Sequence, residues 1–342
     1  MPDPANAETP MNVVRLPIGE AHDLGGAALR GIGFTNDEAR SVVDHLIDNS
    51  LCGYRFAGLP RILALADSPE IRQPRRPIAI EYETPISARV DGGNHVGYVA
   101  MDFCVDLAIS KAGKSGVALI GAHNSWLSGR NAYYLEKLAH AGFVGIHTVA
   151  STPAVVPPGA RQRFLGTNPL AIALPGEPDP FIFDMGTAAT MWGEVLLKSY
   201  LNESLPDGIG VDAEGRPTNS AAEMIRGGVL PFGGHKGFGL SLAIQALGLL
   251  GGGITPTATA IDRGFLFIVF DPGLLLPRAQ FTAELARLIA TIKSLPRQPG
   301  VDEIRIPSER AFRERMQRRA EGFITVDRPV YERLVTLAGR NS

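Results

Sequence analysis

Short apolar runs alternate with longer amphipathic stretches along most of this chain, and this alternation limits the fold more than any other feature. The apolar runs are typical of buried strands, and they cover residues 117–120, 143–149, 171–174, 181–184 and 264–271, with the end of another strand at 88–91. Helical spacing of apolar residues occurs at 100–112, 133–140, 238–250 and 281–293. Strands and helices that alternate in this way predict α/β layers.

The two ends of the chain add further elements. A strand is predicted at 13–16 and helices at 19–30, 308–321 and 329–338. Thr35 followed by Glu38 is a capping-box pattern, which predicts that another helix begins there. The stretch 238–250 is apolar on most sides, so we predict that it is a buried helix, which the glycines at 251–253 end.

Length and charge limit the class of protein. A chain of 342 residues suggests about two domains. The net charge of -2 gives no electrostatic case for nucleic acid as a partner. The basic cluster at 313–319 alternates with glutamates, which predicts a solvated helix face. No apolar run reaches the roughly 20 residues that cross a bilayer, and residues 1–11 lack a secretion-signal pattern. We therefore expect a cytoplasmic protein with no membrane partner.

Cysteines and short motifs leave the chemistry open. Cys52 and Cys104 lie among apolar residues, which predicts buried thiols rather than a disulfide or a metal site. No Gly-x-Gly-x-x-Gly follows the first strand, so the usual dinucleotide fingerprint is missing. The glycine-rich stretch 233–239 has the wrong spacing for a P-loop, and neither His-Glu-x-x-His nor Gly-x-Ser-x-Gly occurs.

Four segments together give a more specific signal. They are Leu165-Gly166-Thr167-Asn168-Pro169; Phe183-Asp184-Met185 with Thr187 and Gly193; Leu205-Pro206-Asp207-Gly208 with Asp212, Gly215, Pro217 and Thr218; and Gly233-Gly234-His235-Lys236-Gly237-Phe238-Gly239-Leu240. Their order and spacing resemble the malate/L-lactate dehydrogenase-type family of NAD(P)-dependent oxidoreductases. Weaker matches extend the resemblance over roughly residues 13–339.

The resemblance implies an α/β fold of the malate/L-lactate (sulfolactate) dehydrogenase type, which is not a classical Rossmann fold. It implies a discontinuous substrate and dimerisation domain from residues 13–115 and 276–339, and an NAD(P)-binding domain at 116–275. The expected ligands are NADP or NAD and a small-molecule substrate, the expected assembly is a homodimer, and no metal is expected.

The proton donor of the family is missing from this chain. Where the family has Gly-His-Asp-Ser-His-Gly-x-x-Arg, this chain has Gly53-Tyr54-Arg55-Phe56-Ala57-Gly58-Leu59-Pro60-Arg61. The second histidine is the family's donor, and Ala57 takes its position with a methyl group that has no proton to give. The arginine that binds the substrate carboxylate in the family is kept as Arg61, and such pairs are strong anchors.

Other polar positions of the family change as well. The cofactor segment Asn-Ser-His-His-x-Gly reads Asn124-Ser125-Trp126-Leu127-Ser128-Gly129 here. We expect Trp126 and Leu127, together with Phe56 and Ala57, to make the pocket more apolar than that of its relatives. A lysine of the family is replaced by Glu194, and a glutamate by Gln245.

The resemblance gives a candidate site in three groups. Catalysis is expected from Asp184, Lys236 and His235, and substrate binding from Arg61, Tyr54, Phe56 and Ala57. The cofactor is expected at Asn124, Ser125, Ser128, Gly129, Thr167, Asn168, Asp184, Met185, Thr187, Lys236 and Gly237. His95, His123, His147 and His235 are the histidines that could replace the donor, with His235 ranked first. Structural alternatives stay open: Asp184 could cap a turn, and Arg61 could begin a surface helix. Thr167 and Asn168 could be turn residues, and Lys236 a solvated loop lysine.

Three hypotheses follow for function. The first is an NAD(P)H-dependent reductase of a 2-oxo acid or cyclic imine, because an imine that is already protonated needs less acid assistance than a ketone. The second is a non-redox enzyme on the same scaffold, such as a lyase or isomerase. The third is a catalytically silent protein that binds a ligand. Removal of a general acid costs about 10²–10⁴-fold in rate, which permits inactivity without requiring it.

Overall fold

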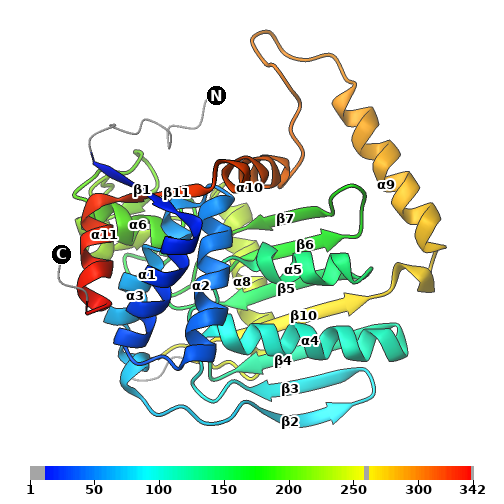
Figure 1. Ribbon diagram of the computed structural model, residues 1–342, viewed down its shortest axis with the longest axis horizontal. Coiled ribbons are helices and arrows are strands. Elements are labelled where there is room, and N and C mark those ends of the chain that lie inside the picture. The colour runs from blue at the N-terminus through cyan, green and yellow to red at the C-terminus, as the bar shows by residue number, and fades with distance from the viewer. Residues whose placement is uncertain (1–11, 258–261, 340–342) are drawn as a thin grey trace. The chain divides into compact units, whose positions relative to one another are not determined.

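The computed structural model describes residues 12–257 and 262–339, which form two compact units (Figure 1). Unit 1 comprises the described residues up to Ile71 and from Ala311 onward, and unit 2 runs from Arg72 to Arg310. The division is discontinuous, with boundaries at 71 and 311, and the predicted functional domains with boundaries at 115 and 276 stay a prediction. Which part of the chain binds a dinucleotide is a separate, functional question, and that assignment stays a prediction.

Unit 1 contains a two-stranded sheet that joins the two ends of the chain. β1 (Val13–Pro17) lies antiparallel to β11 (Phe323–Asp327). The helices are α1 (Ile18–Gly31), α2 (Asn36–Leu51), α3 (Arg61–Asp67), most of α10 (Glu309–Glu321) and α11 (Arg328–Leu337), and a 3-10 turn spans Arg55–Ala57. The core includes the fully buried side chains of Leu29, Leu46, Ile62 and Leu334.

The capping box predicted at the start of α2 is confirmed. The backbone N–H of Glu38 donates to Thr35 Oγ1 at 3.3 Å, and the N–H of Thr35 donates to Glu38 Oε2 at 2.8 Å. Two N–H groups that the helix itself cannot satisfy are thereby paired.

The arginines of α10 are not all solvated, which corrects the prediction for residues 313–319. Arg315 Nη1 lies 3.1 Å from Asp48 Oδ1, and Arg318 Nη1 donates to the carbonyl of Leu51 at 2.8 Å. Both cations therefore bind the C-terminal end of α2, where the helix dipole favours positive charge.

Unit 2 is built on a seven-stranded sheet with the order β2-β3-β4-β10-β5-β6-β7. The strands are β2 (Ala79–Thr84), β3 (Ser87–Asp91), β4 (Val117–His123), β5 (Val144–Ala150), β6 (Leu170–Leu174), β7 (Phe181–Met185) and β10 (Gly264–Phe270). Within the described sheet, β3 and β4 are parallel neighbours and every other pair is antiparallel. A classical Rossmann sheet is mostly parallel, so the predicted difference from that fold is confirmed.

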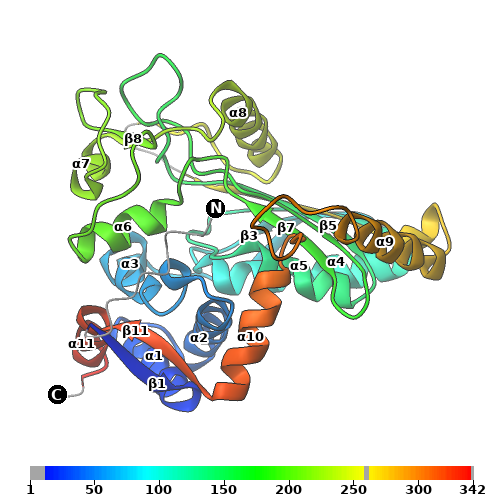
Figure 2. The same ribbon diagram turned by 90° about the horizontal axis from the view of Figure 1, so that it is seen from above.

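Helices cover both faces of this sheet. α4 (Gly97–Ser115) and α5 (Asn131–His140) lie on one face, and α8 (His235–Leu250) lies on the other (Figure 2). A smaller lobe contains α6 (Trp192–Tyr200), α7 (Ala221–Arg226) and the short pair β8 (Gly210–Val211) and β9 (Gly228–Val229). Val155, Leu165, Val195 and Met224 are among its buried core residues. The predicted amphipathic helix near 281–293 is α9 (Arg278–Lys293), none of whose residues is buried.

Helix α8 corrects a prediction, because it is not buried on most sides. Its buried residues are Gly237, Ser241, Ile244 and Gly248. They form one stripe, and the glycines allow close packing: a Cβ at Gly248 would lie 2.4 Å from the Cβ of Ala150. Leu242, Leu249 and Leu250 lie off this stripe and are 52%, 48% and 69% exposed. The helix therefore carries apolar side chains on its outer surface.

Two further properties bear on chemistry. No helix in the described part of the chain has both the length and the apolarity that a bilayer crossing requires. Cys52 and Cys104 are buried and reduced, as predicted, and burial raises the pKa of the Cys104 thiol to about 12. Across residues 12–257 and 262–339, no three potential metal-ligating side chains come together in a cluster.

Candidate active site

The predicted site residues of unit 2 gather where strands of the sheet end. β4, β5 and β7 run in the same direction, because β4 and β5 are both antiparallel to β10, and β5 and β7 are both antiparallel to β6. Their carboxyl ends lead into the loops after His123, Ala150 and Met185, and β6 begins beside them at Leu170. Ligands of open α/β sheets bind outside the carboxyl ends of strands, so this edge is the candidate site.

The side chain of Asn168 links three segments at this edge of the sheet through hydrogen bonds. It is fully buried and has a φ of 33°. Its Oδ1 accepts a hydrogen bond from the N–H of Ser151 at 2.9 Å. Its Nδ2 donates to the carbonyl of Ser241 and to Gln245 Oε1, each at 3.0 Å. Both atoms of the amide are engaged inside the protein, so Asn168 shapes the site rather than offering its side chain to a ligand.

Thr187 extends the same frame from β7. Its Oγ1 donates to the carbonyls of Thr167 and Asn168, each at 3.1 Å. Its own carbonyl accepts from the N–H of Phe232 at 3.0 Å, which ties the frame to the glycine-rich segment that follows. Gln245 stands where the family has a glutamate, and its neutral oxygen accepts the bond from Asn168 without burying a charge.

The loop 124–129 after β4 has a strained backbone. Asn124, Leu127 and Gly129 have φ angles of 49°, 57° and 77°, and a leucine rarely adopts this conformation. Strain of this kind clusters at functional sites. The polar side chains of the loop bond within the protein: Asn124 Nδ2 donates to Asp91 Oδ1 at 2.6 Å, and Ser125 Oγ donates to the carbonyl of His95 at 2.8 Å.

Trp126 does not line an apolar pocket, which corrects that expectation. It is 2% exposed, and its Nε1 donates to the carbonyl of Asn94 at 3.1 Å. Ser128 is also buried, and its carbonyl accepts from the hydroxyl of Tyr134 at 2.5 Å. The exposed surface of the loop therefore comes from Leu127, Gly129 and part of Asn124.

Asp184 lies at the end of β7 and caps a helix. Its Oδ2 accepts the N–H of Ala132 at 2.8 Å, in the first turn of α5. Burial raises the pKa of the Asp184 carboxyl above its ordinary value, while the N–H of Ala132 and the charge of Arg130 act in the opposite direction. The backbone N–H of Asn131 also bonds to this carboxyl, so the structural alternative accounts for much of its environment. Asp184 as a residue is half-buried, and its catalytic role stays a prediction. Met185, the next residue, pairs with Leu170.

The glycine-rich segment forms the N-terminus of α8. Gly233 and Gly234 have φ angles of 54° and 61°, and a Cβ at either would meet nothing within 4 Å. His235 and Lys236 follow them and are exposed. Gly237 is buried, and no larger residue fits there, because a Cβ would lie 2.1 Å from the carbonyl oxygen of Phe232.

The predicted substrate residues belong to unit 1. Tyr54, Phe56 and Ala57 lie in or beside the 3-10 turn, and Arg61 is the first residue of α3; all four are partly exposed. Asn49 Nδ2 donates to the carbonyl of Ala57 at 2.9 Å. The turn is also fixed by Arg55, which replaces the motif's aspartate.

Arg55 holds the turn against β11. Its Nε donates to Asp327 Oδ2 at 2.8 Å, and its Nη2 donates to the other carboxylate oxygen. The Asp327 side chain is 5% exposed, so the bidentate pair is partly shielded from water. The position next to the vacated donor therefore has a structural use in this chain.

Glu194, the charge reversal, lies in the first turn of α6. A carboxylate there interacts favourably with the positive end of the helix dipole.

His147 is unsuited to replace the donor. Its ring stacks on Phe267 with 3.7 Å between centroids, and its Nδ1 lies 3.0 Å from the carbonyl of Leu266. Burial lowers the pKa of His147 to about 3, so the imidazole is neutral near pH 7.

Two residues beside Asp184 were missed by the sequence analysis. Arg130 and Asn131 are 9% and 1% exposed, and among the described residues neither amide atom of Asn131 has a hydrogen-bond partner. A polar residue at the start of a helix usually indicates a cap, and nothing in its spacing signalled burial.

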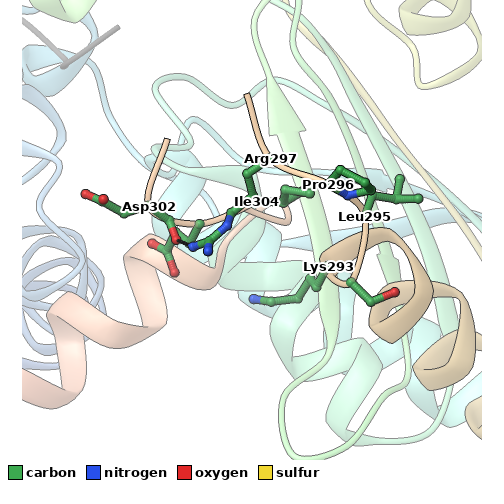
Figure 3. Close-up of a pocket in the computed structure, with 8 residues that line it drawn as sticks. Lys293, Leu295, Pro296, Arg297, Asp302 and Ile304 are labelled. Carbon is green, nitrogen blue, oxygen red and sulfur yellow. Dashed lines mark hydrogen bonds between the residues drawn. The ribbon is translucent and has the colours of Figure 1, made fainter. Parts of the chain in front are cut away.

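A cavity of about 470 Å³ lies elsewhere, at the end of α9 (Figure 3). It is lined by Lys293, Ser294, Leu295, Pro296, Arg297, Asp302, Glu303 and Ile304. Its lysine is already paired, since Lys293 Nζ lies 2.5 Å from Glu309 Oε1. The cavity contains none of the predicted site residues, so its size does not locate the active site.

The fold is shared with solved dehydrogenases. The structure of malate dehydrogenase from Pyrococcus horikoshii matches with a TM-score of 0.85 at 29% identity and covers 97% of each chain. L-sulfolactate dehydrogenase of Methanocaldococcus jannaschii is 33% identical over 316 residues, which are 90% of this chain and 91% of the relative. A Delta(1)-pyrroline-2-carboxylate/Delta(1)-piperideine-2-carboxylate reductase of Pseudomonas putida is 36% identical over 247 residues, 68% of this chain and 70% of the relative.

Residues 16–335 match the family model described as malate/L-lactate dehydrogenase. The chain therefore belongs to the malate/L-lactate dehydrogenase family, a family of NAD-dependent oxidoreductases. The resemblance predicted from the four segments is confirmed, whereas the roles of individual site residues stay predictions.

Proposed function

We propose that this protein is an NAD(P)H-dependent oxidoreductase that reduces a 2-oxo acid or a cyclic imine, with an altered proton donor. One observation carries the proposal. The hydrogen-bonded frame of Thr167, Asn168 and Thr187 is complete at the strand ends, while the donor position holds Ala57. The frame lies at the carboxyl ends of strands, where ligands of α/β sheets bind, and this supports a retained ligand site.

The start of α8 fits the phosphates of a dinucleotide. Its first turn contains no acidic residue, and the N–H groups and dipole of a helix N-terminus favour an anion. Gly233 and Gly234 leave the backbone open to close approach, and Lys236 supplies a positive charge. Thr167, Met185 and Gly129 of the predicted cofactor set would hold the remainder of the group. When bound, the reduced nicotinamide supplies a hydride.

A cyclic imine suits the residues at the donor position. The nitrogen of a protonated imine already carries a proton. Loss of the proton donor at Ala57 should therefore slow reduction of an imine less than reduction of a ketone. Arg61 would bind the substrate carboxylate, and Tyr54 and Phe56 would contact the ring. Asp184, whose pKa is raised by burial, would orient the acceptor or hold a proton. The Pseudomonas putida relative is named for substrates of this class.

Cofactor binding is the first test. The purified protein is titrated with NADH and with NADPH while nicotinamide fluorescence is followed, which also separates NAD from NADP preference. Saturable binding of either supports the proposal. If neither binds at millimolar concentration, the non-redox and silent hypotheses replace it.

Restoring the donor is the second test. In Ala57→His, we expect reduction of a 2-oxo acid such as pyruvate to rise by up to about 10²-fold, the lower range for a general acid, while reduction of pyrroline-2-carboxylate changes little. Lys236→Ala and Asp184→Asn are expected to lower turnover of the better substrate. Unchanged turnover in both variants would remove these residues from the site.

We also propose a cytoplasmic homodimer, as the resemblance implies. The exposed leucines of α8 and the wholly unburied helix α9 are apolar surfaces that a second subunit could cover. Light scattering of the purified protein at several concentrations measures the assembly directly.

A further inference from the structure

His123, the last residue of β4, lies between two carboxylates. Its Nδ1 is 3.2 Å from Asp262 Oδ2, and its Nε2 is 3.1 Å from Glu81 Oε2. Asp262 precedes β10, and Glu81 lies on the edge strand β2. The imidazole ring therefore bridges two separate segments of unit 2 at the edge of the sheet where the candidate site lies.

A carboxylate at hydrogen-bond distance from each ring nitrogen favours the charged form of the ring. An ionised carboxylate only accepts hydrogen bonds, so both ring nitrogens must carry a proton. The imidazolium balances a group of acids. Glu81 is also bound by Arg89 at 3.0 Å, and Asp91, which His123 influences at longer range, is bound by Arg76 at 2.8 Å. Loss of the proton would leave Asp262 and Glu81 facing a neutral ring.

The same contacts reach the loop 124–129. The second oxygen of Asp262 accepts the N–H of Asn124 at 2.8 Å, and the side chain of Asn124 donates to Asp91. Asp262 thus joins the charged ring to the first residue of the strained loop. The backbone of Gly252 packs against the His123 ring. Its φ is 101°, and a Cβ at this position would lie 2.6 Å from His123 Cδ2. The glycine run at 251–253, expected to end α8, therefore also makes room for this ring.

We propose that His123 is a positioning residue, whose charged ring holds Asp262 in place so that the loop 124–129 keeps its strained, ligand-ready conformation. Its effect on cofactor binding rests on the proposed function, whereas its effect on the loop does not. His123 touches neither substrate nor cofactor in this proposal and acts through Asp262 and Asn124.

The proposal predicts a pH dependence of known sign. The bonds to Asp262 and Glu81 raise the pKa of His123 from 6.5 to about 9, against the effect of burial. A raised pKa means that the stabilising contribution is complete below about pH 6.5 and is lost as the pH rises through about 9. Hydrogen exchange of the amides at 124–129 should therefore be slow at neutral pH, and the opening equilibrium that it reports should increase above pH 9.

The test compares His123→Gln and His123→Arg with the wild type from pH 7 to pH 10. Glutamine has no charge, so the loop should open at every pH, and the Kd for NADH should rise about 10-fold, the loss expected for hydrogen bonds to charged groups. Arginine keeps its charge across this range, so its variant should hold the loop at pH 10 better than the wild type does. Asp262→Asn should match His123→Gln, and the double variant should add little.

His140→Gln is the control, because His140 is exposed on α5 of the same unit, 3.5 Å from Glu136. It should behave as the wild type at each pH. The proposal is overturned if His123→Gln leaves both loop exchange and NADH affinity unchanged, or if the wild type and His123→Arg lose protection at the same pH. If no variant binds NADH but the exchange differences appear, the proposed function fails and the role of His123 stands.

Discussion

Replacement of Asn168 by alanine should destabilise unit 2 without unfolding unit 1. The substitution removes an amide that is fully buried and joins the ends of β5 and β6 to α8. The N–H of Ser151 and the Oε1 of Gln245 lose the partners described above, in two bonds that are partly buried. Ser241 loses less, because its carbonyl also lies inside a helix.

The magnitude follows from these two groups and the backbone. Each buried polar group left without a partner costs about 1–3 kcal/mol, and alanine at a left-handed φ, here 33°, adds about 1–2 kcal/mol. Asn168→Ala should therefore lower the free energy of unfolding of unit 2 by about 3–8 kcal/mol. Asn168→Gly relieves the backbone term and should be about 1 kcal/mol less destabilised than the alanine variant.

Tryptophan fluorescence in urea measures this change in the right unit. The chain has 2 tryptophans, and Trp126 and Trp192 both belong to unit 2. Asn219→Ala is the matched control, since Asn219 makes one exposed bond to Asp207 at 2.9 Å and should cost under about 0.5 kcal/mol. The reasoning is refuted if the free energy of unfolding of Asn168→Ala lies within about 1 kcal/mol of the wild-type value. It is also refuted if Asn168→Gly is less stable than Asn168→Ala.

Three further predictions concern stability. Thr35→Ala should lower stability by about 1 kcal/mol in thermal unfolding followed by circular dichroism, and Thr35→Ser should not; equal losses would contradict the capping box. Arg315→Ala should cost about 1–3 kcal/mol, because it leaves Asp48 short of a charged partner. Arg319→Ala, 63% exposed and 3.9 Å from the same carboxylate, should cost little; a reversed order would contradict the contacts. His147 has a pKa lowered to about 3, so its stabilising effect is complete above pH 6.5, the ordinary value, and declines as the pH falls. In His147→Phe the loss of stability between pH 7 and pH 5 should shrink in urea titrations, and an unchanged loss would show that the ring is charged in the folded protein.

Apolar runs in the sequence predicted the strands that are buried in the sheet. The strands β4, β5, β6, β7 and β10 were found within a few residues of their ends, because each is a compact apolar run. The edge strand β2 was missed, since its residues are exposed or half-exposed and an edge strand needs no apolar face. The burial of α8 was predicted wrongly because hydrophobicity does not say which side of a helix is covered.

The candidate site shows the same limit. The resemblance to the family placed Asn124, Thr167, Asn168 and Thr187 in one site, and the structure brings the last three into one hydrogen-bonded frame. The sequence could not show that these side chains form hydrogen bonds within the protein, because their partners are distant in sequence. Asn124 bonds to Asp91, and only the pairing of β3 with β4 makes them neighbours. Nor could a histidine at a strand end be distinguished from an ordinary one before its two carboxylates were in place.

The pairing of β1 with β11 has a consequence for biosynthesis. Val13 leaves the ribosome early, but the residue opposite it, Asp327, is added when almost the whole polypeptide has been translated. All the strands of the seven-stranded sheet are synthesised before that moment, and domains generally fold as units during synthesis. The apolar faces of α1 and α2 therefore remain incompletely covered until the segment with β11 and α11 has been synthesised. A nascent chain stalled before Phe323 would expose those faces to chaperones.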